Sequence, residues 1–136
     1  MKSIARVKFL VLNFNENISI EIIANENIAN KNIAILKIAN DTHAYCKLSG
    51  LLTEMAAEQI PNAYEILKPL VDQLIEAFGA ERIMWGSDWP VVCLAGGYAR
   101  WNDLTQALLK DLDPASQNAI LFKTAEQFYG LEGVRS

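Results

Sequence analysis

The first 49 residues of the sequence lack glycine and proline, although the whole chain has seven glycines and four prolines. Ile, Asn, Glu, Ala and Lys dominate this first part, and the three tryptophans all come after it. Glycine and proline mark tight turns, so their absence from this part sets it apart from the rest of the chain. The shift in composition predicts two unlike parts of the chain.

Cysteine and histidine are scarce as well. The two cysteines, Cys46 and Cys93, lie far apart without a CxxC spacing, which excludes a disulfide framework or a zinc knuckle. We therefore expect two free, partly buried thiols and a reducing cytoplasmic location. The single histidine, His43, is predicted to be a surface residue between a helix and a strand.

No basic stripe and no long apolar run are present. The net charge of −4 disfavours nucleic acid as a partner, because binding it requires clustered cations that neutralise phosphates. The longest apolar run near the start covers residues 7–12 and includes Lys8, whereas a membrane span needs roughly 20 residues. With 51% hydrophobic and 21% charged residues, the 136-residue chain is predicted to be one globular domain without a membrane partner.

The hydrophobic pattern predicts alternating strands and helices. We expect a hairpin over residues 5–14 and 18–24, helices over 27–39, 61–78, 101–112 and 114–129, and strands over 44–52 and 82–86. Asp113 is the predicted N-cap of the last helix, with Pro114 in its first turn. The order strand, helix, strand implies a right-handed crossover between two adjacent parallel strands. Because two strands make a poor sheet, we expect an α/β fold that is part of something larger or that recruits its own hairpin.

Polar residues accompany both of the predicted parallel strands. Lys47 and Ser49 lie in the second half of the first strand, and Asp88 follows the second strand. In α/β proteins, catalytic and ligand-binding residues lie in the loops at these carboxyl ends of the strands. Trp85 and Trp89 flank Asp88, and their apolar bulk would exclude water and favour a general base. The alternative is that Asp88 is only a turn or N-cap residue, since isolated motifs give many false positives.

Three segments of the sequence, two of which include the residues just described, resemble a known family. Residues 45–51 (YCKLSGL) and 78–91 (FGAERIMWGSDWPV) closely resemble the amidohydrolase-related family, above all its sugar-lactone and dicarboxylate-lactone hydrolases. Tyr98, Trp101 and residues 124–131 (TAEQFYGL) fit the same pattern in the same order. The resemblance covers residues 35–131, which leaves an atypical segment, residues 1–34, and a tail, residues 132–136.

The resemblance implies the last quarter of a TIM-barrel-like fold. Residues 47–51 would be its seventh strand and residues 82–86 its eighth. Asp88 would be the general base for the attacking water, and a metal ligand in members that bind zinc. Lys47, Ser49, Trp89 and Tyr98 are the expected substrate-binding residues of a lactone hydrolase, with a small lactone or carboxylate as substrate.

Departures from the family pattern limit this expectation. Metal-dependent members carry a His-x-His pair and further histidines, whereas His43 is the one histidine here. One Asp without a suitably placed histidine cannot supply the four ligands of zinc, so we predict no cofactor and no metal ligands. A TIM barrel takes roughly 250 residues. Residues 121–123 stand where relatives often carry a Gly pair, which implies a differently seated last helix.

Three functional interpretations remain open from the sequence. The first is a hydrolase fragment with weak or no activity alone. The second is a barrel completed by another chain or a second copy, because exposed sheet edges invite partners. The third is a non-catalytic α/β module in which Trp85, Trp89 and Trp101 only pack the core.

Overall fold

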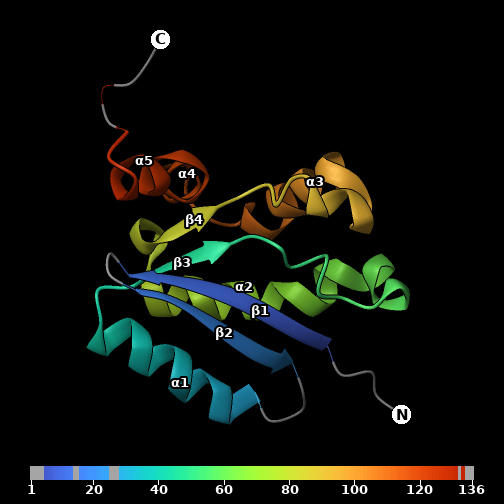
Figure 1. The fold of residues 1–136 in the computed structure, drawn as a ribbon, viewed down its shortest axis with the longest axis horizontal. Coiled ribbons are helices and arrows are strands. Elements are labelled where there is room, and N and C mark those ends of the chain that lie inside the picture. The colour runs from blue at the N-terminus through green and yellow to red at the C-terminus, as the bar shows by residue number, and fades with distance from the viewer. Residues whose placement is uncertain (1–4, 14–15, 25–27, 132, 134–136) are drawn as a thin grey trace.

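The computed structural model describes residues 5–13, 16–24, 28–131 and 133 of the chain (Figure 1). Strands β1 (Ala5–Asn13) and β2 (Glu16–Ala24) form an antiparallel hairpin, and helix α1 (Ile28–Asp41) follows. The predicted hairpin and helix are therefore confirmed. Part of the predicted turn between the two strands lies outside the described residues.

A parallel strand pair forms the centre of the fold. Strands β3 (Tyr45–Leu48) and β4 (Ile83–Trp85) run parallel, and helix α2 (Ala63–Phe78) connects them. Strand β1 pairs antiparallel with β3, so the sheet has the order β2-β1-β3-β4. The α/β class, the adjacent parallel strands and the recruitment of the chain's own hairpin are thus confirmed.

Strand β3 is shorter than predicted. It ends at Leu48 rather than at residue 52, and residues 51–54 form a turn. Gly50 has a φ of 75°, which lies outside the extended region that a strand needs. The turn brings the chain into a short 3₁₀ helix, η1 (Ala57–Asn62), which leads into α2.

The remaining helical elements follow α2 in the chain, and several of them pack beside β4. They are η2 (Ala80–Arg82), η3 (Val91–Ala95), α3 (Gly97–Leu109), α4 (Pro114–Asn118), the π-helical turn η4 (Ala119–Lys123) and α5 (Thr124–Phe128). The predicted cap is confirmed, because the Asp113 carboxylate accepts a hydrogen bond from Ser116 N at 2.9 Å. The π-helical turn η4 contains residues 121–123, and it leaves Phe122 59% exposed.

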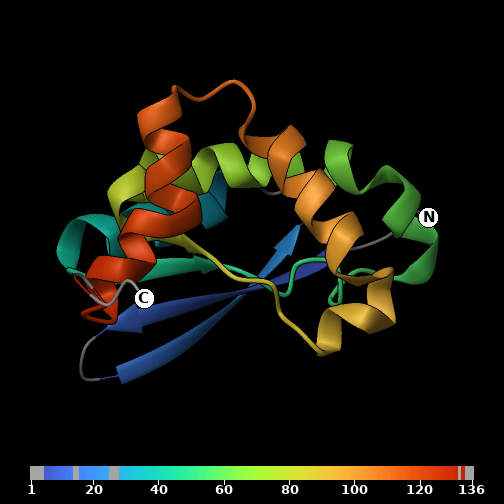
Figure 2. The same ribbon diagram turned by 90° about the horizontal axis from the view of Figure 1, so that it is seen from above.

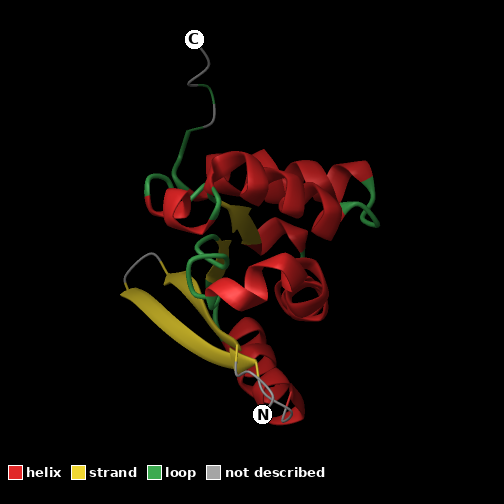
Figure 3. Cartoon of the chain, turned by 90° about the vertical axis from the view of Figure 1, so that its right-hand side faces the viewer, coloured by secondary structure: helices red, strands yellow, loops and turns green. Residues whose placement is uncertain are grey.

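The helices lie to one side of the hairpin, and no described element covers its other side (Figures 2 and 3). The core forms between the sheet and α2 and α3, where Leu48, Leu67, Leu108 and Trp101 are almost fully buried. Each such aliphatic side chain contributes about 1.5–3 kcal/mol through its burial. Among the described helices, none has the length and apolar character that crossing a membrane requires.

Candidate active site at the strand ends

The carboxyl ends of β3 and β4 come together at Gly86. Its backbone N–H donates to the carbonyl of Leu48 at 3.1 Å, which continues the pairing beyond β4. A Cβ at this glycine would lie 2.9 Å from Cε of Lys47 and 3.2 Å from Oγ of Ser49. Lys47, Ser49 and Gly86 therefore share one face of the sheet, with the lysine side chain lying against the glycine.

Asp88 lies two residues beyond this point, in the left-handed region with a φ of 58°. This conformation is uncommon for residues other than glycine, although Asp adopts it more readily than most. The Asp88 carbonyl accepts a hydrogen bond from Val92 N at 2.8 Å, which starts η3. The backbone around Asp88 therefore forms a tight turn between β4 and η3.

The Asp88 carboxylate meets the loop that follows β3. Oδ2 lies 3.3 Å from Oγ1 of Thr53, and a Cβ at Gly50 would lie 3.4 Å from the same oxygen. The Thr53 hydroxyl is also 2.9 Å from the carbonyl of Gly50, to which it donates. The sequence did not single out Thr53, because the contact joins residues 35 positions apart.

Two of the three tryptophans hold the end of β4 against α3. Trp101 is 1% exposed, and its indole N–H donates to the carbonyl of Gly86 at 2.8 Å. The Trp85 indole N–H donates to the Thr105 hydroxyl at 2.8 Å, and that hydroxyl donates to the carbonyl of Trp101 at 2.8 Å. These bonds fix the backbone two residues before Asp88.

The other aromatic candidates, Trp89 and Tyr98, lie at the surface. Trp89 is 70% exposed, so the exclusion of water that we expected from this side chain is not seen in the described structure. Tyr98 is 50% exposed, and its ring packs edge-on against Trp85 at a centroid distance of 6.0 Å. Asp88 itself is half-buried.

A cavity of about 280 Å³ adjoins this site. It lies between the loop after β3 and η3, and its lining includes Thr53 together with the apolar side chains of Leu52, Met55, Ile60, Val91 and Leu94. The Asp88 carboxylate and the cavity thus share Thr53 as a neighbour.

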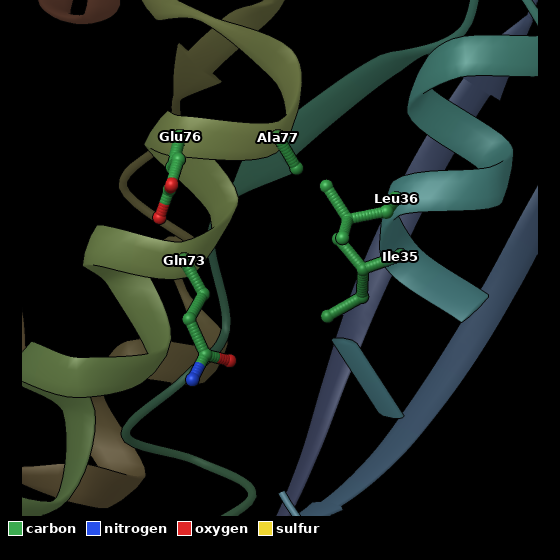
Figure 4. A pocket seen from close by; sticks show the side chains of 5 residues that line it. All are labelled: Ile35, Leu36, Gln73, Glu76 and Ala77. Carbon is green, nitrogen blue, oxygen red and sulfur yellow. The ribbon is translucent and has the colours of Figure 1, made fainter. Parts of the chain in front are cut away.

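A second cavity, of about 200 Å³, lies between α1 and α2 (Figure 4). Ile35, Leu36, Gln73, Glu76 and Ala77 line it. The last three belong to the second half of α2, which leads to the start of β4. This cavity is therefore at the opposite end of the parallel strands from Asp88 and is not part of the candidate site.

The described residues do not fit a zinc site. Nowhere in the described part of the chain do three His, Cys, Asp or Glu side chains come close enough to hold a metal ion. The neighbours that Asp88 does have are the hydroxyl of Thr53 and the backbone of Gly50, which are not the imidazole and thiolate ligands that zinc prefers. His43 is exposed before β3, as predicted.

The two cysteines differ from each other. Both are free, as predicted. Cys46 is fully buried in β3, and burial raises the pKa of its thiol to about 12 because the thiolate loses its solvation. Cys93 is exposed in η3, so the prediction of a partly buried thiol is wrong for this residue.

Comparison with known proteins identifies the class. The model of the amidohydrolase family matches residues 23–131, so the chain belongs to this family. The L-fucono-1,5-lactonase of Burkholderia multivorans is 36% identical over 92 residues, which are 65% of this chain and 31% of the relative. The L-fucono-1,5-lactonase of Burkholderia ambifaria is 41% identical over 68 residues, which are 48% of this chain and 22% of the relative.

Solved structures agree with this assignment. Two crystal structures of an amidohydrolase from Burkholderia multivorans, one with bound zinc and one with bound HEPES, match with TM-scores of 0.64 and 0.69. Their identities to this chain are 31% and 32%. Each match covers 76% of this chain and 37% of the solved chain, so the chain spans less than two fifths of the relatives' length.

Proposed function

We propose that the chain provides the Asp88-bearing part of a lactone hydrolase, with Asp88 as the general base. The observation that carries this proposal is the place of the carboxylate, where the loops after two adjacent parallel strands meet. In α/β enzymes this is the usual position of acid and base residues. The similarity to two L-fucono-1,5-lactonases supports a lactone as the substrate class.

In the proposed reaction Asp88 removes a proton from water, and the water oxygen attacks the carbonyl carbon of the lactone. The ring C–O bond then breaks, and the ring oxygen takes up the proton as it leaves as a hydroxyl. Lys47 and Ser49 are the proposed contacts to substrate oxygens. Lys47 is half-buried, and none of the described carboxylates pairs with it, so its ammonium group is open to a negatively charged oxygen. Trp89 and Tyr98 would contact the substrate through their exposed rings.

We further propose that β3 and β4 are the seventh and eighth strands of a TIM-barrel-like fold. The extent of the matches supports this, because they cover only 37% of each solved relative. In such a barrel, loops from all eight strands build the substrate pocket. We therefore expect the 136-residue chain alone to hydrolyse lactones weakly or not at all, and a second copy or another chain could complete the barrel through the sheet edges.

A chimera tests the proposal. Residues 35–131 of this chain would replace the matching region of the Burkholderia multivorans L-fucono-1,5-lactonase, and hydrolysis of L-fucono-1,5-lactone would be followed by acid release. We expect hydrolysis that Asp88→Asn abolishes. The matched control is Asp103→Asn, which changes an exposed carboxylate on α3 and should leave the rate unchanged. A folded chimera whose activity survives Asp88→Asn would contradict the assigned role.

A second candidate is a non-catalytic module, and the packing of the tryptophans favours it. The Trp85 indole N–H donates to Thr105 of α3, and the indole N–H of Trp101, which lies in α3, donates to the carbonyl of Gly86, as core residues do. This interpretation predicts that the chimera folds but has no activity, whereas Trp101→Ala in the natural chain causes unfolding. Replacing Trp89 should then have little effect, because its side chain is 70% exposed.

A further inference from the structure

We infer that Thr53 is a positioning residue that orients the Asp88 carboxylate, and this inference rests on the proposed function. Oγ1 of Thr53 lies 3.3 Å from Oδ2 of Asp88, and the two residues belong to different loops. Among the described residues this is the one side chain that forms a hydrogen bond with the Asp88 carboxylate. The contact therefore links the orientation of the carboxylate to the loop after β3.

The Thr53 hydroxyl is itself held in place. It lies 2.9 Å from the carbonyl of Gly50, across the turn that ends β3. One hydroxyl has a single proton and two lone pairs, so it can share its proton between two acceptors, or keep it on the carbonyl and accept from a protonated carboxyl group. Thr53 can therefore remain in contact with Asp88 both before and after the carboxylate takes up a proton.

The remaining freedom of Asp88 lies in its side chain. The backbone is fixed by the turn with a φ of 58° and by the bond from Val92 N. Trp89, which follows directly in sequence, is 70% exposed. The backbone of Gly50 lies close to the carboxylate, because a Cβ added at Gly50 would lie 3.4 Å from Oδ2. Thr53 and the backbone of Gly50 therefore hold Oδ2 in place. We assign to the other oxygen, Oδ1, the removal of the proton from the attacking water.

The test measures the orientation of Asp88 directly, in the full 136-residue chain labelled with ¹³C and ¹⁵N. Three-bond couplings about the Cα–Cβ bond report whether the Asp88 side chain keeps one rotamer. We expect one rotamer in the parent chain and in Thr53→Ser, which keeps the hydroxyl. We expect couplings averaged over several rotamers in Thr53→Val, which is the same shape without the hydroxyl. The matched control is Thr42→Val, because the Thr42 hydroxyl donates to Ile38 O at 2.6 Å and is distant from Asp88 in sequence.

The chimera adds a kinetic measurement. Thr53→Val should lower kcat by up to roughly 100-fold, the effect expected of a misplaced catalytic group, with KM nearly unchanged. Thr53→Ser should restore most of the rate. A loss that serine does not restore would indicate a general structural role and overturn the inference, and so would Asp88 couplings that are the same in Thr53→Val and the parent.

The two proposals fail in different ways. An inactive chimera, combined with Asp88 couplings that depend on Thr53, would overturn the proposed hydrolase function and leave the orienting contact in place. An active chimera that requires Asp88, combined with couplings that do not depend on Thr53, would overturn the positioning role alone. If Thr53→Val does not fold, Thr53→Ser and Thr53→Ala provide a second comparison with and without the hydroxyl, because both variants lack the γ-methyl group.

Discussion

Replacing Thr105 by valine should destabilise the fold measurably, because its buried hydroxyl forms hydrogen bonds with Trp85 at the end of β4 and with Trp101 in α3. Thr105 is 0% exposed, accepts a hydrogen bond from the Trp85 indole at 2.8 Å and donates one to the carbonyl of Trp101 at 2.8 Å. Valine has the same shape and removes both bonds. Such bonds contribute about 0.5–1.5 kcal/mol each, and leaving a buried donor unpaired costs about 1–3 kcal/mol.

The two effects do not simply add. The Trp101 carbonyl keeps its backbone bond within α3, and Trp85 is only half-buried, so water can reach part of its ring. We therefore expect the free energy of unfolding to fall by about 2 kcal/mol, a large part of the typical total of about 5–15 kcal/mol. For a domain of this size the melting temperature should fall by roughly 4 °C per kcal/mol, or about 8 °C.

The assay is urea unfolding followed by tryptophan fluorescence, together with a thermal melt. Thr105→Ser is the control, because it keeps the hydroxyl and removes only a methyl group. The order of stability should be parent, serine variant, valine variant. If the valine variant unfolds at the parent's urea concentration while the serine variant is weaker, the hydroxyl contributes nothing and the methyl group alone matters.

Three other predictions follow from the described contacts. Gly86→Ala should lower the free energy of unfolding by about 1 kcal/mol, since its methyl group would meet Cε of Lys47 at 2.9 Å and force that flexible side chain aside; an unchanged urea midpoint would argue against this contact. A maleimide should modify Cys93 in the folded chain and Cys46 only after unfolding, as mass spectrometry would show, because Cys46 is buried with a pKa of about 12. The helix-capping hydrogen bonds lower the pKa of Asp113 below its ordinary value of 3.8, so its stabilisation is complete above that value and is lost as the pH falls through the lowered pKa. The melting temperature of Asp113→Asn should therefore depend less on pH than the parent's in acid, and identical pH profiles would contradict the cap.

Much of the fold followed from local patterns in the sequence. Apolar periodicity marked α2, and the strand–helix–strand order implied the parallel pair, because connection handedness leaves few alternatives. The length of β3 was wrong because one glycine, Gly50, takes a left-handed φ that the hydrophobic pattern does not report. The 3₁₀ helix η3 lies between the strand predicted over residues 82–86 and the helix predicted over 101–112, and no helix was predicted there because its five residues are too few for a periodic signal.

The candidate site was only partly predictable for a related reason. Asp88 could be found because its position after a strand is a local property. Thr53 could not, because its contact with Asp88 exists only once the two strands lie side by side. The sequence also could not separate packing tryptophans from surface ones, since Trp89 and Trp101 differ in exposure, 70% against 1%, but not in residue type.

The antiparallel docking of β1 on β3 has a consequence for any assembly of this chain. Strand β3 has two hydrogen-bonding edges, and β4 occupies one while β1 occupies the other. A closed barrel of parallel strands has no spare edge, so the strand preceding β3 would need the place that β1 holds. The hairpin and a completing partner therefore compete for the same backbone groups. Completion of such a barrel would require release of the hairpin from β3, so removing residues 1–24 should favour it.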